Sequence, residues 1–288
     1  MKPSPLVSII IAHYNLSEYI DEAIDSCLNQ TYKNIEVIIV DDCSNDEWAI
    51  KKIAGLKKKY PKIKLIKNPV NKGSAKTFNI GVETAKGEYC CCLDADDKFE
   101  KTFIEKVLKC LLRDSKLGFA TSWIRVFGDN NSIEKTPSFN VSALLIRNLF
   151  SSASMFAKEA WKKVGGFDPL MKTYRDWDFW LNLVEEGYRW EVIEEPLICS
   201  RDRKGSASKL SIEKNLLFIN KILQKHENLY KKYVKEVITP LYEMVMKLNR
   251  DVKDMNSVNN TLNTVINTRG WKLLEKLRSF RDKLFSDI

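Results

Sequence analysis

The sequence has no long hydrophobic run, only 2 histidines in 288 residues, and no regular spacing among its 7 cysteines. No stretch approaches the roughly 20 apolar residues that span a bilayer. The first apolar run, Leu6–Ala12, is also too short for the core of a signal peptide. The cysteines, three of them consecutive at Cys90–Cys92, match neither a metal site nor a disulfide framework. These absences predict a cytoplasmic protein with free, buried cysteines.

Two glycine-rich phosphate-binding motifs are also missing. No Gly-x-Gly-x-x-Gly follows the first apolar run, and no Gly-Lys-Ser/Thr of the Walker type occurs. Dinucleotide-dependent dehydrogenases and P-loop ATPases are therefore disfavoured.

Positive charge is in excess and is unevenly distributed. The net charge is +9, and residues 211–288 alone carry 15 Lys/Arg against 9 Asp/Glu. A basic C-terminal end suits an anionic partner such as a membrane surface, a nucleic acid or an acidic protein. The alternative is a lysine-rich face that only increases solubility. With 44% hydrophobic residues, the chain can build one sizeable core plus an appendage.

The first hundred residues alternate between strand and helix patterns. Continuous apolar runs, typical of strands buried on both faces, end near residues 12, 40 and 93, and a further strand is expected at 63–67. Helix-like periodicity separates these four segments. Four such alternations with short connections predict an α/β protein with a doubly wound, mostly parallel sheet flanked by helices.

Carboxylates follow two of these strands directly. Asp41 and Asp42 end the second strand, and Asp94, Asp96 and Asp97 end the fourth. Parallel strands bring their carboxyl ends to the same edge, where open α/β sheets bind ligands. Acids this close repel one another unless a cation lies between them, and oxygen ligands suit Mg²⁺ or Mn²⁺ with a substrate diphosphate. The alternative is an acidic turn that simply ends a strand.

The second half of the chain follows a looser pattern. It predicts a strand at 119–127, a polar loop at 129–138, a short helix at 141–149 and a strand at 152–157. After the turn Gly165-Gly166, Asp176 and Asp178 stand at the start of an apolar helix, whose dipole keeps a carboxylate ionised. A substrate pocket is the favoured interpretation of this segment; a helix-capping Asp is the alternative.

These segments together resemble a known series of motifs. In order they are Val7-Ser8-Ile9-Ile10-Ile11, His13-Tyr14-Asn15, Val40-Asp41-Asp42-Cys43-Ser44, Asn71-Lys72-Gly73, Leu93-Asp94-Ala95-Asp96-Asp97, Gly165-Gly166-Phe167-Asp168 and Asp176-Trp177-Asp178-Phe179-Trp180-Leu181. Each motif alone is weak, but seven in this order resemble the family 2 inverting glycosyltransferases, which have the GT-A fold. The resemblance covers roughly residues 5 to 208.

The resemblance implies a role for each matching position in nucleotide binding. Tyr14 would stack on the nucleobase, and Asp42 would accept a hydrogen bond from a base N–H. Gly73 would let the backbone approach the nucleotide closely, and Asp94 would hold the ribose.

The resemblance also implies the reacting groups. Asp96 would bind Mg²⁺ or Mn²⁺, which bridges the diphosphate, and Asp176 would be the general base. Inverting transfer needs one carboxylate to take the acceptor proton and a cation to stabilise the leaving diphosphate. Arg175 replaces the acid that often precedes the base, and is expected either to lower the pKa of Asp176 or to bind an anionic acceptor group.

Further expectations concern Arg203 and the two histidines. Arg203, in the predicted loop 200–208, stands where many members carry a metal-binding histidine; it is expected to clamp the diphosphate instead. Neither histidine is expected to be catalytic: His13 could line the nucleotide cleft, and His226, in a lysine-rich helix, is expected to be solvated.

Strand patterns end near residue 208. We expect a GT-A catalytic domain at 1–208, a helical linker at 209–238, an oligomerising coiled coil at 239–268 and a basic amphipathic tail helix at 269–288. Thr239-Pro240 is typical of a helix start, and apolar residues then alternate at heptad spacing, with Asn259 as a polar residue in the stripe. A helix that packs on its own domain is the alternative. The tail, with Trp271 at its head, suits an anionic membrane surface.

The sequence therefore predicts an inverting glycosyltransferase that transfers a sugar from a nucleotide-sugar donor to a hydroxyl of a glycan or lipid-linked glycan in surface polysaccharide synthesis. A UDP-linked donor is the favoured one. It is expected in the cytoplasm, peripherally on the inner face of the membrane if the tail binds there, with no nucleic-acid partner. Two alternatives stay open. A sugar-nucleotide nucleotidyltransferase would need a glycine-rich basic first loop, which the segment 13–17 lacks. A non-catalytic coiled-coil scaffold would not need the acids.

Overall fold

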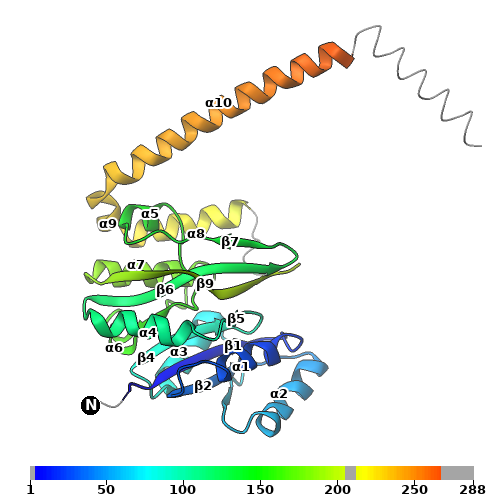
Figure 1. Cartoon of the computed structure of the whole chain (residues 1–288), viewed down its shortest axis with the longest axis vertical. Coiled ribbons are helices and arrows are strands. Elements are labelled where there is room, and N and C mark those ends of the chain that lie inside the picture. Colours follow the sequence, from blue (N-terminus) through cyan, green and yellow to red (C-terminus); the bar gives the residue numbers. More distant parts are fainter. Residues whose placement is uncertain (1–3, 205–211, 267–288) are drawn as a thin grey trace, which may run out of the picture. The chain divides into compact units, whose positions relative to one another are not determined.

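The structure is a computed structural model in which residues 4–204 and 212–266 are described. The chain divides into two compact units, Met1–Tyr233 and Val234–Ile288. The first contains every described strand, and the described part of the second is one helix, α10 (Val234–Ile266) (Figure 1).

The first unit is built on a mixed sheet whose N-terminal half is parallel. Its strands β1 (Val7–His13), β2 (Ile35–Asp41), β3 (Lys64–Lys67) and β4 (Tyr89–Asp94) lie in the order β3-β2-β1-β4. Chain order reverses between β1 and β4, which creates the crevice where doubly wound sheets bind ligands. In the register, His13 pairs with Asp41 and Ala12 with Asp94, so both acidic strand ends reach one edge.

The sheet continues from β4 with strands of both directions. Its remaining strands are β8 (Met155–Ala157), β6 (Leu117–Gly128), β9 (Arg189–Asp202) and β5 (Lys98–Phe99), with β7 (Ser132–Glu134) paired to β6. β8 runs antiparallel to β4 and to β6, whereas the long β9 runs parallel to β6 beside it (Figure 1). The predicted doubly wound, mostly parallel sheet is thus confirmed, with antiparallel additions beyond β4.

Helices cover the sheet on both faces. They are α1 (Ile20–Leu28), α2 (Glu47–Lys59), α3 (Ser74–Thr84), α4 (Phe103–Arg113), α5 (Val141–Ile146), α6 (Lys158–Lys163), α7 (Arg175–Glu185), α8 (Ile212–Lys225) and α9 (Glu227–Lys232). An aliphatic core joins α1, α2 and α4 to the strands. A separate aromatic cluster, in which Phe156, Phe179 and Trp180 contact one another, fixes α7 against β8.

Several predicted boundaries differ from the structure. The expected loop 129–138 contains β7, and Ser200–Asp202, expected in a loop, are the end of β9. The last helix begins at Val234 rather than at Thr239, and Pro240 lies inside it. Pro240 has no backbone N–H, so one helical hydrogen bond is missing there. The apolar stripe nevertheless continues through that turn, and so does the helix. The expected free cysteines are confirmed, since all seven are free and Cys90–Cys92 are buried in β4.

The apolar stripe of α10 faces solvent in this single chain. Leu241, Val245, Leu248, Val252 and Leu262 are each between 40% and 53% exposed. The predicted amphipathic tail at 269–288 lies outside the described residues. Among those that are described, no helix is both long and apolar enough to cross a membrane.

Candidate active site

The loop before α3 is fixed by Asp42, which follows β2. The carboxylate accepts hydrogen bonds from the backbone N–H groups of Lys72 (2.9 Å) and Gly73 (2.8 Å) and from Asn68 Nδ2 (2.7 Å). Gly73 has φ +82°, in the left-handed region that favours glycine. Asp42 is buried, and three protein donors already use its two oxygens. It therefore shapes the predicted nucleotide loop, while its hydrogen bond to a base remains a prediction.

His13 ends β1 and forms a buried cluster with β2. Its Nδ1 lies 3.0 Å from Asp41 Oδ1, which also accepts a hydrogen bond from Ser44 Oγ (2.6 Å). Burial raises the pKa of Asp41, but the contacts with His13 and Ser44 outweigh it and leave the pKa below its usual value. His13 is 1% exposed, so it holds two strand ends together and does not line the cleft as expected. Tyr14, beside it, is 40% exposed and available to a ligand.

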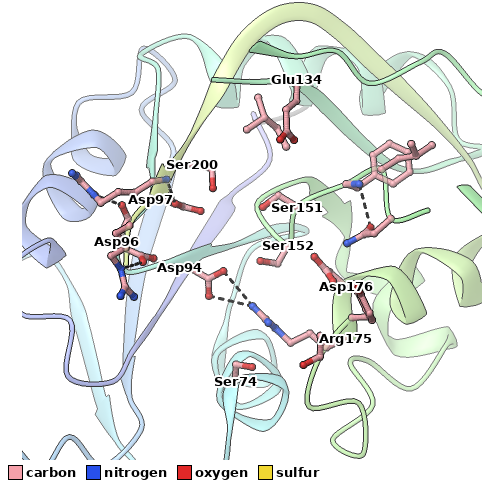
Figure 2. A pocket seen from close by; sticks show the side chains of 18 of the residues that line it. Ser74, Asp94, Asp96, Asp97, Glu134, Ser151, Ser152, Arg175, Asp176 and Ser200 are labelled. Atoms are coloured by element: carbon pink, nitrogen blue, oxygen red, sulfur yellow. Dashed lines mark hydrogen bonds and ion pairs between the residues drawn. The ribbon is translucent and has the colours of Figure 1, made fainter. Parts of the chain in front are cut away.

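A cavity of about 480 Å³ opens at the carboxyl end of β4. Four of the predicted site residues line it: Asp94, Asp96, Asp176 and Arg203. Figure 2 shows Asp96 and Asp97 on one side of the cavity and Asp176 on the other, with Asp94 and Arg175 between them. Tyr14, Asp42 and Gly73 do not line this cavity, but their neighbours Leu16 and Ser74 do.

Each acid of the β4 end is paired with an arginine residue. Arg175 Nη2 lies 3.2 Å and 3.3 Å from the two oxygens of Asp94, and Arg203 Nε donates to Asp96 Oδ2 (2.8 Å). The backbone N–H of Arg201 donates to Asp97 Oδ1 (2.8 Å). Like charges this close are costly in a cavity of low dielectric, and these contacts offset their repulsion.

Burial and mutual repulsion still affect the acids. Burial raises the pKa of Asp94, with Asp96 and Asp176 adding to the effect and Arg175 opposing it. For Asp97, burial and the charges of Asp94 and Asp96 raise the pKa well above its ordinary value. Such a cluster favours any ligand that brings a further positive charge.

Asp176 is placed by the unusual start of α7. Tyr174, which precedes the helix, has φ +59°, a left-handed conformation that is rare and strained for a bulky residue. This conformation turns the chain so that Lys172, Arg175 and Asp176 all line the cavity. Asp176 Oδ1 accepts a hydrogen bond from the N–H of Trp177 (2.9 Å), which orients the carboxylate.

Asp178, although two residues away, has a different environment. It is fully buried and accepts hydrogen bonds from Lys225 Nζ (2.8 Å) and Asn182 Nδ2 (3.2 Å). His226 Nε2 lies 3.1 Å from its other oxygen. The expectation that His226 is solvated is therefore wrong: the ring is 0% exposed, since the turn between α8 and α9 packs it onto α7.

The acid pair Asp94/Asp96 fits a divalent cation only in part. Among the residues that the structure describes, no three His, Cys, Asp or Glu side chains converge to hold a metal ion by themselves. Mg²⁺ is commonly bound through one or two carboxylates with substrate phosphates as the other ligands. Two carboxylates at the mouth of a cavity large enough for a diphosphate match that arrangement, so the residues fit a metal that arrives with its substrate.

Sequence reasoning missed part of the cavity. Asn148, Ser151 and Ser152 line it from the segment between α5 and β8. This segment reaches the site because β8 is antiparallel to β4, and the N–H of Cys92 donates to the carbonyl of Ser152 (3.2 Å). The only available signal was the serine-rich run 151–154 directly before a buried strand.

A family model and several known proteins match this chain. The model of the family described as Glycosyl transferase family 2 matches residues 8–175. An uncharacterized glycosyltransferase of Methanocaldococcus jannaschii is 29% identical over 291 aligned positions, covering 92% of this chain and 97% of that protein. An Escherichia coli protein named UDP-Glc:alpha-D-GlcNAc-diphosphoundecaprenol beta-1,3-glucosyltransferase is 35% identical, covering 64% of this chain and 72% of that one.

A solved structure with a similar fold is the mannosyltransferase of Pyrobaculum calidifontis in complex with GDP-Man and Mn²⁺. It superposes with a TM-score of 0.61 at 16% identity, over 100% of this chain and 89% of that one. At this identity the likeness shows the fold, which is the predicted GT-A fold.

Proposed function

Because this chain belongs to the family 2 glycosyltransferases, we propose that it transfers a sugar from a UDP-linked donor, with inversion, to a hydroxyl of a glycan or lipid-linked glycan in surface polysaccharide synthesis. The observation that carries the proposal is the shared cavity of Asp94, Asp96 and Asp176. The Escherichia coli relative, whose name gives a UDP-sugar donor and a diphosphoundecaprenol-linked acceptor, supports the substrate classes.

Asp176 acts as the general base. Inverting transfer requires the acceptor hydroxyl to attack the anomeric carbon from the side opposite the leaving diphosphate. Asp176 and the pair Asp96 and Asp97 lie on different sides of the cavity in Figure 2, and a sugar would bind between them. The hydrogen bond from the N–H of Trp177 to Oδ1 of Asp176 holds the carboxylate in place, with Oδ2 to accept the proton.

The donor diphosphate would lie beside Asp96 and Arg203. Asp96, with Asp94, would hold Mg²⁺ or Mn²⁺, which when bound stabilises negative charge on the leaving diphosphate. Arg203 contributes a fixed positive charge next to Asp96, at 2.8 Å from its carboxylate. Its planar group can also donate paired hydrogen bonds to phosphate oxygens. Tyr14 and the Gly73 loop would bind the nucleoside, as the resemblance implies.

A two-stage experiment tests this proposal. Thermal-shift screening of nucleotide sugars with Mn²⁺ identifies the donor, and hydrolysis and transfer of that donor are then measured. We expect UDP-sugars to bind and turn over. A nucleotidyltransferase would instead release diphosphate from UTP and a sugar phosphate, and a scaffold would bind no nucleotide at all.

We further propose that α10 forms a coiled coil with a second copy of the chain. Its apolar stripe keeps heptad spacing, is exposed, and contains Asn259, a residue type that sets register in coiled coils. Light scattering should show an oligomer for the full chain and a monomer for residues 1–233. A monomeric full chain would refute the coiled coil.

We also propose that the basic segment 269–288 binds an anionic membrane surface. Flotation of the full chain with phosphatidylglycerol vesicles should be lost at high salt and after deletion of residues 269–288, because each basic residue near such a surface contributes about 1 kcal/mol. If flotation does not depend on lipid charge, the membrane proposal is wrong and the basic residues only increase solubility.

A further inference from the structure

Arg175 lies at the centre of the reaction cavity, where a transferred sugar would lie if the proposed function is right. Its side chain is only 16% exposed, and it extends from α7 to Asp94, between the β4 acids and Asp176 (Figure 2). The central guanidinium carbon lies over the ring of Phe78, 5.1 Å from its centroid. The cation is thus held in place in the cavity wall, where a bound substrate can contact it.

The ion pair with Asp94 does not satisfy this guanidinium. A single nitrogen, Nη2, serves both carboxylate oxygens at 3.2 Å and 3.3 Å, whereas a strong arginine–carboxylate pair uses two nitrogens at shorter distances. The Nε atom is buried and has no hydrogen-bond partner. Buried charged donors are normally satisfied, so the contact with Asp94 leaves part of the hydrogen-bonding capacity of Arg175 unused beside the cavity.

The same loop adds a second cation to this side of the cavity. Lys172 is exposed and lines the cavity with Arg175 and Asp176, brought there by the left-handed backbone at Tyr174. Strained residues of this kind cluster at ligand-binding sites. Lys172 and Arg175 are thus two cationic side chains from the segment that also carries Asp176, and all three line the same cavity. A neutral hexose gives these cations only hydroxyl groups, whereas a carboxylate on the sugar matches the planar guanidinium.

We propose that Arg175 binds the carboxylate of a uronic acid, so that the substrate class of this enzyme is a uronic-acid-containing glycan. The inference rests on the proposed glycosyltransferase function and specifies its substrate. The carboxylate belongs either to the donor, as a UDP-uronate, or to the sugar at the end of the acceptor. Lys172 assists from the rim of the cavity.

Whether the donor supplies the carboxylate is tested by titration calorimetry on the full chain. The two ligands are UDP-glucose and UDP-glucuronic acid, which differ only at C6. We expect the wild type to prefer UDP-glucuronic acid by about tenfold or more, because a site built for a charged group discriminates strongly against its absence. Arg175→Gln should remove the preference, and Arg175→Lys should keep part of it. Arg113→Gln, which removes an exposed arginine outside the cavity, should leave the preference intact.

Whether the acceptor supplies the carboxylate is tested by measuring transfer to oligosaccharides that end in glucuronic acid or in glucose. If the acceptor supplies the carboxylate, Arg175→Gln raises KM for the uronate-ended acceptor and leaves the neutral one unchanged. The inference is overturned if Arg175→Gln, with an unchanged melting temperature, alters neither discrimination. Failure of the proposed function gives a different result: neither UDP nor any UDP-sugar then binds the wild type.

Discussion

Substitutions of Asp176 and Asp178 should have different effects, one on turnover and the other on the stability of the fold. The two acids are two residues apart on α7, yet only Asp176 lines the cavity and only Asp178 is fully buried. We expect Asp178→Ala to destabilise the fold and Asp176→Asn to reduce turnover strongly. The resemblance points to Asp176 as the base, and the different environments of the two acids make that choice testable.

The magnitude for Asp178 follows from its contacts. Removing one partner of a buried ion pair costs about 3–5 kcal/mol, because the remaining charge is left uncompensated. Lys225 is 37% exposed and keeps a second contact with Asp168 at 2.8 Å, so solvent screens part of the loss and the lower end, about 3 kcal/mol, applies. For a unit of this size that corresponds to a fall in Tm of about 6–12 °C.

The assay is differential scanning calorimetry combined with donor turnover. Asp178→Ala should melt about 6–12 °C lower, and Asp178→Asn, which keeps an acceptor for Lys225 and Asn182, should lose less. Asp176→Asn should keep the wild-type Tm and donor affinity while turnover falls about a hundredfold or more. The reasoning is refuted if Asp178→Ala melts with the wild type, or if Asp176→Asn retains turnover.

Three further predictions test the metal, the nucleotide loop and the acid response. Asp96→Ala should lose the part of UDP affinity that depends on Mn²⁺; titration calorimetry with and without Mn²⁺ would contradict this if wild type and variant gave the same Mn²⁺ dependence. Gly73→Ala should destabilise the chain by about 1 kcal/mol because φ is +82° there. Gly55→Ala, in the exposed middle of α2 with free space around the new methyl group, should stabilise it by about 0.5–1 kcal/mol in the same urea titration; equal signs would refute the backbone explanation. Burial raises the pKa of Asp168, but Lys225 and the N–H of Leu170 outweigh it and lower the pKa, so its stabilisation is present above about pH 4 and is lost as the pH falls through the lowered value. Asp168→Asn should therefore melt below the wild type at pH 7, and the difference should close as the pH falls from about 4 to 2; a constant difference would exclude this group.

The sheet and its acidic edge could be predicted because their signals are local. A buried parallel strand is a continuous apolar run, and Asp42, Asp94 and Asp96 follow such runs directly in the sequence. The parallel pairing of β1 with β2 and β4 then brings them to one edge without further information. The same logic failed at β9, whose polar end, Ser200–Asp202, pairs with β6 instead of forming a loop.

The partners of the acids could not be predicted because they come from distant segments. Arg175 reaches Asp94 across 81 positions, and Arg203 reaches Asp96 across 107. His226 was expected to be solvated because its neighbours in the sequence are lysines, but tertiary packing against α7 decided its burial. Helical periodicity alone does not show which face of a short helix meets the rest of the fold.

These long-range pairs explain how the site can exist before its substrate binds. Three carboxylates within four residues would repel one another in a buried strand end, and burial already raises the pKa values of Asp94 and Asp97. Arg175 and Arg203 supply compensating positive charge from α7 and from just beyond β9, which offsets part of this repulsion. A donor that arrives with its cation must take over contacts with Asp94 and Asp96, and the displaced arginine donors then need new anionic partners. The diphosphate would offer one to Arg203, and the proposed uronate carboxylate would offer one to Arg175.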